Sequence, residues 1–133
     1  MRAILLLMVI AGGCSSNSPL VLEFDIGVNA PSAASVLIDG NIMLPPTNGV
    51  LSRGYPSLTE AMKVAGTVES RDADGTVRAS THYSFGTYCA THMPLLREVE
   101  RFIETADAAG TPSMTLDSIE CVLTDGTGVV VAP

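Results

Sequence analysis

Two histidines and two cysteines are the residues of this sequence that could together hold a transition metal. They are His82, Cys89, His92 and Cys121, and they include one Cys-x-x-His step. Two thiolates and two imidazoles can bind zinc tetrahedrally, but this spacing differs from that of zinc-finger ligands. In an oxidising compartment the two cysteines would form a disulfide instead. We therefore predict no metal site and expect both histidines at the surface or at strand ends.

A second set of candidate ligands surrounds an Asp-Gly pair. Aligned with an EF-hand loop, Ser70, Asp72 and Asp74 fall at positions 1, 3 and 5, and Gly75 falls at position 6. Position 12 should be a bidentate Glu, but it is Thr81, and the flanking sequence predicts no pair of helices. Asp-Gly is also the sequence expected in a tight hairpin turn. We therefore expect a hairpin here and no calcium.

Groups suited to covalent or acid–base catalysis are sparse. The sequence lacks the G-x-S-x-G elbow of serine hydrolases. Cys89 and His92 could form a thiol–base pair, but a disulfide would remove that thiol. Glu98, Glu100 and Glu104 are expected on the solvated face of a helix, where they would contribute only to solubility. We predict no catalytic residues, no cofactor and a role in binding or structure rather than catalysis.

The composition limits the partners of the chain. Its 133 residues carry a formal net charge of −7 at pH 7, and Lys and Arg together number only 7. Phosphate backbones would repel such a chain, which disfavours nucleic-acid binding. The sequence has no Trp, three Phe and three Tyr, which predicts an aliphatic core. Tyr83, Phe85 and Tyr88 are accordingly expected in core positions, and the alternative is an aromatic binding patch.

Short apolar segments and turn signals predict several strands. Three Asp-Gly pairs, at 39–40, 74–75 and 125–126, separate apolar segments and predict hairpins, because Asp and Gly both tolerate positive φ. Ser57 and Glu60 form a capping box, so we expect a short helical turn that leads into a strand, although residues 57–66 also alternate as a strand would. The expected strands span residues 20–28, 36–38, 42–44, 50–51, 64–71, 76–88, 113–123 and 127–131.

Residues 94–109 carry the clearest helical pattern. Pro94 suits the first turn of a helix and Gly110 suits the position after its end. The apolar residues follow the spacing of one buried helical stripe, at Leu95, Leu96, Val99, Phe102, Ile103 and Ala106. The predicted fold class is therefore α+β, a small antiparallel β-sheet packed by one amphipathic helix. The alternative is an all-β sandwich in which this helix forms a crossover.

The first sixteen residues have the plan of an export signal. Arg2 provides a positive start, Ala3 to Ala11 is an unbroken apolar segment, and Gly12 and Gly13 are small residues before Cys14. The apolar segment is about half the roughly 20 residues that a membrane-spanning helix needs. We therefore expect a cleaved signal peptide at residues 1–13 rather than a permanent transmembrane anchor.

At Ala11-Gly12-Gly13-Cys14 the sequence resembles a bacterial lipoprotein signal peptide. The resemblance implies cleavage before Cys14, a diacylglyceryl thioether on its sulfur, and acylation of the new amino group by a chain such as palmitate. Ser15 stands where an Asp would favour the inner membrane, so the resemblance implies attachment to the outer membrane. The alternative is an ordinary signal peptide, because Ala11 and Gly13 also satisfy an A-x-A-like cleavage rule, and the product would then be secreted or periplasmic.

Cleavage before Cys14 would leave 120 of the 133 residues and, by removing Arg2, change the net charge from −7 to −8. Residues 14–19 would be the lipidated cysteine and a short tether, and residues 20–133 one globular domain. If Cys14 is lipidated, Cys89 and Cys121 remain and predict a disulfide. We expect a cell-envelope lipoprotein, bound to the membrane through Cys14, that binds an envelope protein or glycan or serves a structural role. The alternative is a small secreted enzyme or inhibitor.

Overall fold

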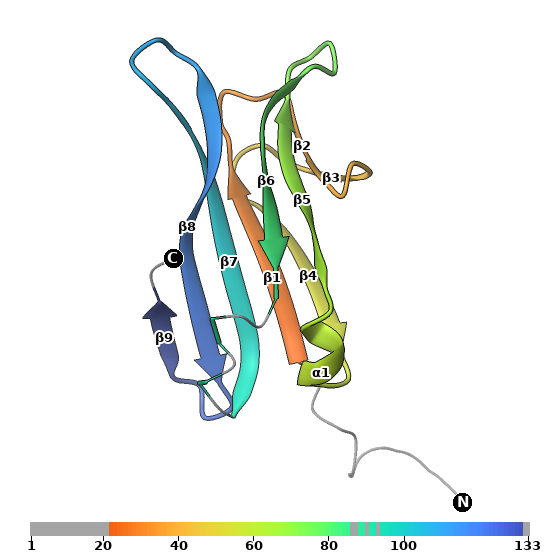
Figure 1. Ribbon diagram of the computed structural model, residues 1–133, viewed down its shortest axis with the longest axis vertical. Helices are drawn as coiled ribbons and strands as arrows, with labels where there is room; N and C mark the ends of the chain where they lie inside the picture. The colour runs from red at the N-terminus through yellow and green to blue at the C-terminus, as the bar shows by residue number, and fades with distance from the viewer. Residues whose placement is uncertain (1–21, 86–87, 90, 93, 132–133) are drawn as a thin grey trace, which may run out of the picture.

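Two β-sheets packed face to face make up the protein (Figure 1). The computed structural model describes residues 22–85, 88–89, 91–92 and 94–131. The five-stranded sheet has the order β4-β1-β7-β8-β9 and the four-stranded sheet the order β3-β2-β5-β6. The elements are β1 (Leu22–Asn29), β2 (Ser35–Ile38), β3 (Ile42–Leu44), β4 (Gly49–Tyr55), α1 (Leu58–Ala61), β5 (Ala65–Arg71), β6 (Val77–Ser84), β7 (Leu95–Ala106), β8 (Pro112–Leu123) and β9 (Gly128–Val131).

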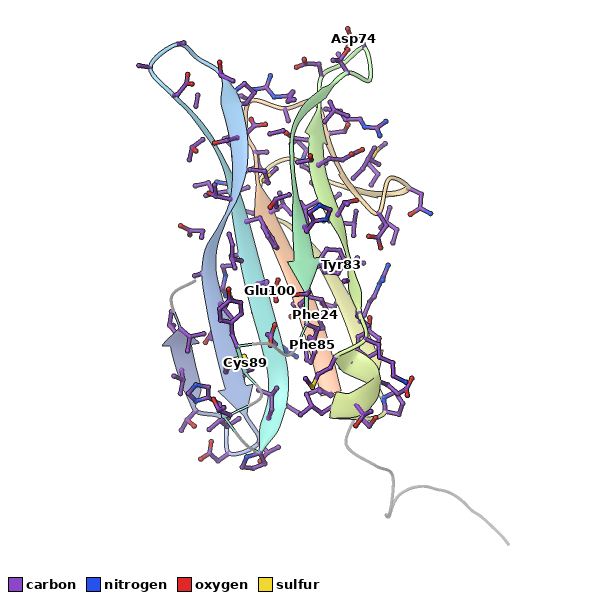
Figure 2. All side chains as sticks on the ribbon, in the orientation of Figure 1. Phe24, Asp74, Tyr83, Phe85, Cys89 and Glu100 are labelled. Atoms are coloured by element: carbon purple, nitrogen blue, oxygen red, sulfur yellow. A yellow bond between two sulfur atoms is a disulfide. The ribbon has the colours of Figure 1, made fainter. Side chains whose placement is uncertain are left out.

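Strand β1 lies inside the five-stranded sheet, between β4 and β7. It pairs antiparallel with β4 and parallel with β7, and the other strand pairs are antiparallel. Its alternation matches the prediction, because Leu22, Phe24 and Ile26 are all buried in the core. Phe24 meets Phe85 edge to face, with ring centroids 4.7 Å apart (Figure 2). The side chains of β1 that alternate with these therefore belong to the outer face of the sheet.

The helix predicted at residues 94–109 is wrong, and both versions of the predicted fold required it. Residues 95–106 form the twelve-residue strand β7, which pairs with β1 on one side and β8 on the other. Among the described residues, the only helix is the four-residue α1. The protein is thus a two-layer β-sandwich. Pairing on both sides gives the backbone of β7 the hydrogen bonds that a helix would otherwise have supplied.

The local turn predictions are confirmed. Asp39 and Gly40 have φ values of 55° and 76° at the β2–β3 turn, and Gly75 and Gly126 have positive φ in the β5–β6 and β8–β9 turns. The side chain of Ser57 caps α1 by accepting a hydrogen bond from the Glu60 backbone at 3.2 Å. The short helical turn leads directly into β5, as predicted.

The three aromatic residues that were predicted to lie in the core differ in their burial. Tyr83 and Phe85 are buried, whereas Tyr88 is 40% exposed. Tyr83, Phe85 and Phe24 lie close together in the core (Figure 2). These three rings therefore pack in the interior and do not form a surface binding patch.

Asp39 connects the β2–β3 turn to β5 and β6. Its Oδ1 accepts a hydrogen bond from the backbone N–H of Thr67 at 3.1 Å, and the Tyr83 hydroxyl donates to its Oδ2 at 2.9 Å. Burial, and then the hydrogen bond and negative charge of Asp39, raise the pKa of Tyr83 to about 12. Tyr83 is therefore a protonated donor at neutral pH. Gly66 lies against this contact, where a Cβ would overlap Asp39 Oδ1 and lie 2.7 Å from two atoms of Tyr83.

Gly66→Ala is expected to lower the free energy of unfolding by about 2 kcal/mol, because overpacking a filled site costs roughly 1–3 kcal/mol. Urea denaturation would measure the change. Gly27→Ala is the matched control in a strand, since a Cβ there would meet no atom closer than 3.6 Å. Equal midpoints for Gly66→Ala and the control would contradict the close approach at Gly66.

Candidate functional site

Three glutamates of β7 point into the sandwich, contrary to the prediction that they lie on a solvated face. Glu98 and Glu100 are 0% and 2% exposed, and the side chain of Glu104 is 5% exposed. Because strand residues alternate between two faces, all three share the inner face of β7 with Phe102. The sequence did not predict this strand, because most of the residues on its inner face are acidic and acidic residues are expected at the surface.

Glu98 and Glu100 form a hydrogen-bonded pair in the core. Burial, and then the hydrogen bond and negative charge of Glu98, raise the pKa of Glu100 from 4.5 to about 9. The Oε2 of Glu100 has no hydrogen-bond partner among the described residues. A carboxyl pair can serve as acid and base only where a substrate reaches it. This pair is enclosed in the core, so it is not placed to act on a substrate.

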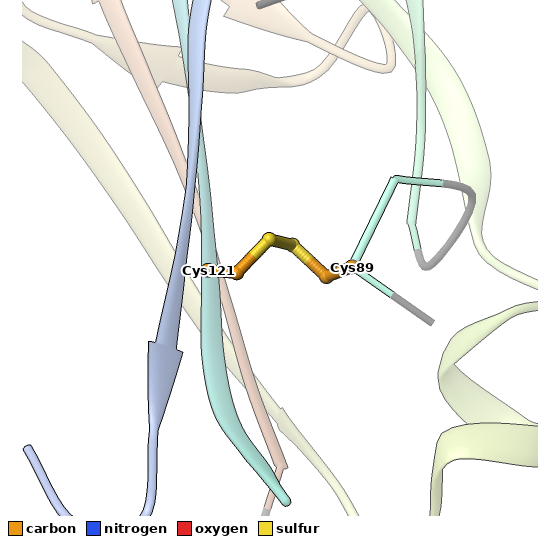
Figure 3. Close-up of a disulfide and its surroundings, with 2 residues drawn as sticks. All are labelled: Cys89 and Cys121. Carbon is orange, nitrogen blue, oxygen red and sulfur yellow. A yellow bond between two sulfur atoms is a disulfide. The ribbon is translucent and has the colours of Figure 1, made fainter. Parts of the chain in front are cut away.

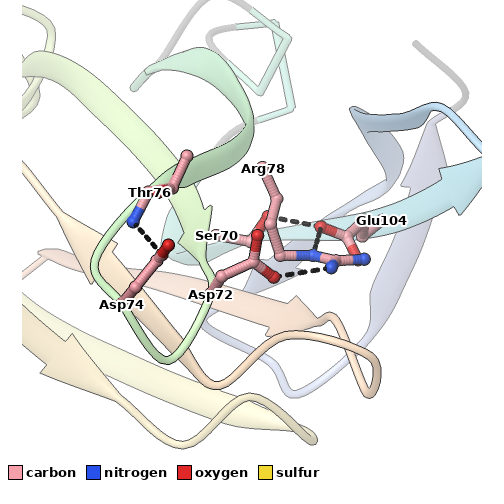
Figure 4. A network of polar contacts seen from close by, with 6 residues as sticks. All are labelled: Ser70, Asp72, Asp74, Thr76, Arg78 and Glu104. Atoms are coloured by element: carbon pink, nitrogen blue, oxygen red, sulfur yellow. Dashed lines mark hydrogen bonds and ion pairs between the residues drawn. The ribbon is translucent and has the colours of Figure 1, made fainter.

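Glu104 links the two sheets at the other end of this row (Figure 4). It accepts a hydrogen bond from the Ser70 hydroxyl of β5 and pairs with Arg78 Nη2 of β6 at 3.1 Å. Arg78 Nη1 also pairs with Asp72 at 2.9 Å. Hydrogen bonds that Arg78 donates to Glu104 and then to Asp72 raise the pKa of its guanidinium above the usual value. The network joins the two sheets through the ion pair between Arg78 and Glu104.

The same network accounts for the residues considered as calcium ligands. Asp72 accepts a hydrogen bond from Arg78, and Ser70 donates one to Glu104 (Figure 4). Asp74 Oδ1 accepts a hydrogen bond from the Thr76 backbone at 2.9 Å. In the part of the chain that the structure describes, no three His, Cys, Asp or Glu side chains converge to hold a metal ion. The segment is the hairpin turn between β5 and β6 that its Asp-Gly pair predicts.

The predicted disulfide between Cys89 and Cys121 is present (Figure 3). Cys89 lies in the connection between β6 and β7, and Cys121 lies on β8, with their Cα atoms 5.6 Å apart. Both cysteines are fully buried. The bond removes both sulfurs from the zinc and thiol–base alternatives. His92 donates its backbone N–H to Cys89 at 2.9 Å, and His82 is exposed on β6. Cys14 lies outside the described residues.

A cleft of about 330 Å³ lies on the outer face of the five-stranded sheet, over β1 between β4 and β7. Its floor is Gly27, whose missing side chain leaves a hollow in an otherwise regular strand. Val50 and Ile103 supply apolar walls, and Asn29 and Asn48 close one end. The side-chain Oδ1 of Asn29 accepts a hydrogen bond from the Asn48 backbone N–H at 3.3 Å, which fixes that end.

Two opposite charges also border the cleft, and both come from strands. Arg101 projects from β7, and its Cγ lies 3.6 Å from where a Cβ of Gly27 would stand. Asp117 occupies an irregularity of β8, because Arg101 pairs with Ser118 while Phe102 pairs with Leu116. Asp117 is therefore the extra residue of a β-bulge, a feature that can redirect a side chain.

None of these cleft residues was predicted from the sequence to be a site residue. The helix predicted at residues 94–109 includes Arg101 and would have separated it from the β1 and β8 residues that lie beside it. The one available signal was Gly27, because a glycine inside an alternating strand often marks a bulge or a close approach. The bulge at Asp117 has no comparable signature in the sequence.

The chemistry of the cleft fits binding better than catalysis. Its described lining residues supply one guanidinium, one carboxylate and two carboxamides, with no histidine, cysteine or hydroxyl group. Nucleophilic catalysis needs a nucleophile beside a base, and neither the cleft lining nor the buried disulfide supplies one. A volume of about 330 Å³ lies at the lower end of the range of small-molecule sites.

Comparisons with known proteins find no match to this chain among family descriptions, curated proteins or solved structures. Across the described ranges, no helix is both long and apolar enough to cross a membrane.

Proposed function

We propose that this protein is a lipoprotein of the bacterial cell envelope that is anchored through Cys14 and has a non-enzymatic binding role. The observation that carries the proposal is the pairing of the cysteines. The Cys89–Cys121 bond suits an oxidising compartment and leaves Cys14 as the remaining thiol. Cys14 directly follows the apolar segment and two small residues that resemble a lipoprotein signal.

The charge and spacing of the chain support attachment through acyl groups. A mature net charge of −8 would repel an anionic membrane surface, so protein side chains would contribute little to attachment. Two or more acyl chains give stable anchoring, whereas one gives marginal binding. Seven residues separate Cys14 from Leu22, where β1 begins, and they reach roughly 25 Å at most. The sandwich would therefore lie close to the membrane.

The intact mass of the non-reduced protein from the bacterial membrane fraction tests this proposal. We expect the mass of residues 14–133 plus acyl groups, less two hydrogens for the disulfide. Cys14→Ala is the control, and it should lose both the acyl mass and the membrane attachment. A cleaved but unacylated wild-type protein would replace the proposal with ordinary secretion, and retention of Met1 would also overturn it.

Ser15→Asp is expected to move the protein from the outer to the inner membrane, because the resemblance assigns this position to sorting. Separation of the two membranes on a density gradient, followed by immunoblotting, would measure the change. Ser18→Asp adds the same charge within the tether and should leave the protein in the outer membrane. An unchanged distribution of Ser15→Asp would contradict the sorting assignment.

A further inference from the structure

We propose that the cleft over Gly27 binds a small zwitterion of the amino-acid type, with the ligand carboxylate on Arg101 and the ligand ammonium on Asp117. The inference rests on the binding role proposed above and does not require the lipid anchor. It follows from three features of the cleft, which are its two charges, its apolar floor and walls, and the bulge that places Asp117.

Both charges lie at the surface beside the cleft, with Asp117 unpaired within the described part of the chain and Arg101 held by one exposed ion pair. No ion pair within 4.0 Å joins Arg101 to Asp117, and Asp117 forms no ion pair or side-chain hydrogen bond among the described residues. Arg101 Nη2 donates a hydrogen bond to Glu120 Oε1 at 3.3 Å in an exposed ion pair, and its side chain is 49% exposed. Exposed ion pairs contribute little free energy, so a ligand carboxylate can share or displace this one. Arg101 is in register with Ser118, the residue after Asp117, so the two charges lie on neighbouring strands at the same cleft.

The floor and walls fit an uncharged apolar group. Gly27 leaves the hollow between Val50 and Ile103, and its volume suits a small molecule rather than a macromolecular segment. An amino acid presents a carboxylate and an ammonium on one carbon and an apolar side chain beside them. These three parts match the guanidinium, the carboxylate and the hollow.

The bulge explains why Asp117 reaches this face. Ser118 pairs with Arg101, which is on the outer face, so in a regular strand the preceding residue would point inward opposite Phe102. The additional residue in β8 instead leaves Asp117 exposed beside Arg101 and lining the cleft. If the bulge served only to keep the Asp117 carboxylate out of the core, neither the hollow nor the Arg101 cation would be needed beside it.

Titration of the mature, acylated protein in detergent with leucine tests the proposal, with chemical shifts of backbone amides as the readout. We expect shifts at Gly27, Arg101 and Asp117. Leucinamide lacks the carboxylate and N-acetylleucine lacks the ammonium, so each should bind at least tenfold more weakly, which is the effect of about 1.4 kcal/mol. Absence of leucine binding, or equal binding of all three compounds, would overturn the zwitterion site.

Variants separate the roles of the two charges. Asp117→Asn should abolish the preference for leucine over N-acetylleucine, and Arg101→Gln should abolish the preference over leucinamide. Glu60→Gln, on α1, should keep both preferences. Unchanged preferences in the two cleft variants would overturn the assignment. The mass of the same samples reports acylation separately, so failure of this site is distinguishable from failure of the proposed anchor.

Discussion

Replacing both Cys89 and Cys121 with alanine is expected to lower the free energy of unfolding by about 4 kcal/mol. The two residues are 32 positions apart, and closing a loop of that length removes this much conformational freedom from the unfolded chain in the entropy model. A small domain has a total stability of only about 5–15 kcal/mol. The disulfide would therefore supply a large share of the stability of this domain.

Urea denaturation of the oxidised, reduced and double-alanine proteins would measure this effect. Reduction and double substitution should move the midpoint in the same direction. Adding reductant to the double variant is the control and should change nothing. A midpoint that stays fixed when the wild-type bond is reduced would show that the bond does not stabilise the fold.

The hairpins could be predicted because their signals are local. Asp39-Gly40 needs only its own backbone preferences to form a turn, and Ser57 needs only Glu60 to cap α1. The disulfide was predictable by the count of cysteines, which does not depend on the fold. In each case the interaction that selects the structure is contained in a few residues or in the composition.

Strand β7 could not be predicted, because tertiary contacts override its local pattern. Its apolar residues have helical spacing, while its inner face carries Glu98 and Glu100. A half-buried strand is predicted from alternating apolar and polar residues, and glutamates are expected on its solvated face. This pattern therefore does not predict a strand here. Pairing with β1 and β8 supplies the stabilisation that the local pattern lacks, and the partners on β1 lie over 70 positions away in the sequence. The cleft depends on the same pairing, since it joins Gly27 to Arg101.

The buried carboxyl pair should make the stability depend strongly on pH. Glu100 pairs in register with Ile26 on one side and Ile119 on the other, both buried, and is 2% exposed itself. Its pKa of about 9 in the folded protein exceeds the 4.5 expected when unfolded. Between these values the unfolded chain releases a proton that the folded protein keeps. Folding is therefore favoured at low pH. As the pH rises through this range, Glu100 lowers the free energy of unfolding by up to about 1.4 kcal/mol for each pH unit.

Glu100→Gln should remove this dependence, because the amide cannot ionise and can still donate a hydrogen bond to Glu98. Relative to wild type, the variant is expected to gain about 4 kcal/mol of stability between pH 5 and pH 8. Denaturation curves at several pH values would measure the difference, in which contributions common to both proteins cancel.

Glu120→Gln, on the outer face of β8, is the matched control, and its stability should follow that of wild type across the same range. Parallel curves for Glu100→Gln and wild type would show that Glu100 is already ionised in the folded protein. Divergence only in the Glu100 variant would establish that this sandwich keeps a neutral carboxylic acid in its core. Glu100 can then be buried on the inner face of β7 because its carboxyl group keeps a proton and carries no charge. This explains how an acidic segment can form a central strand.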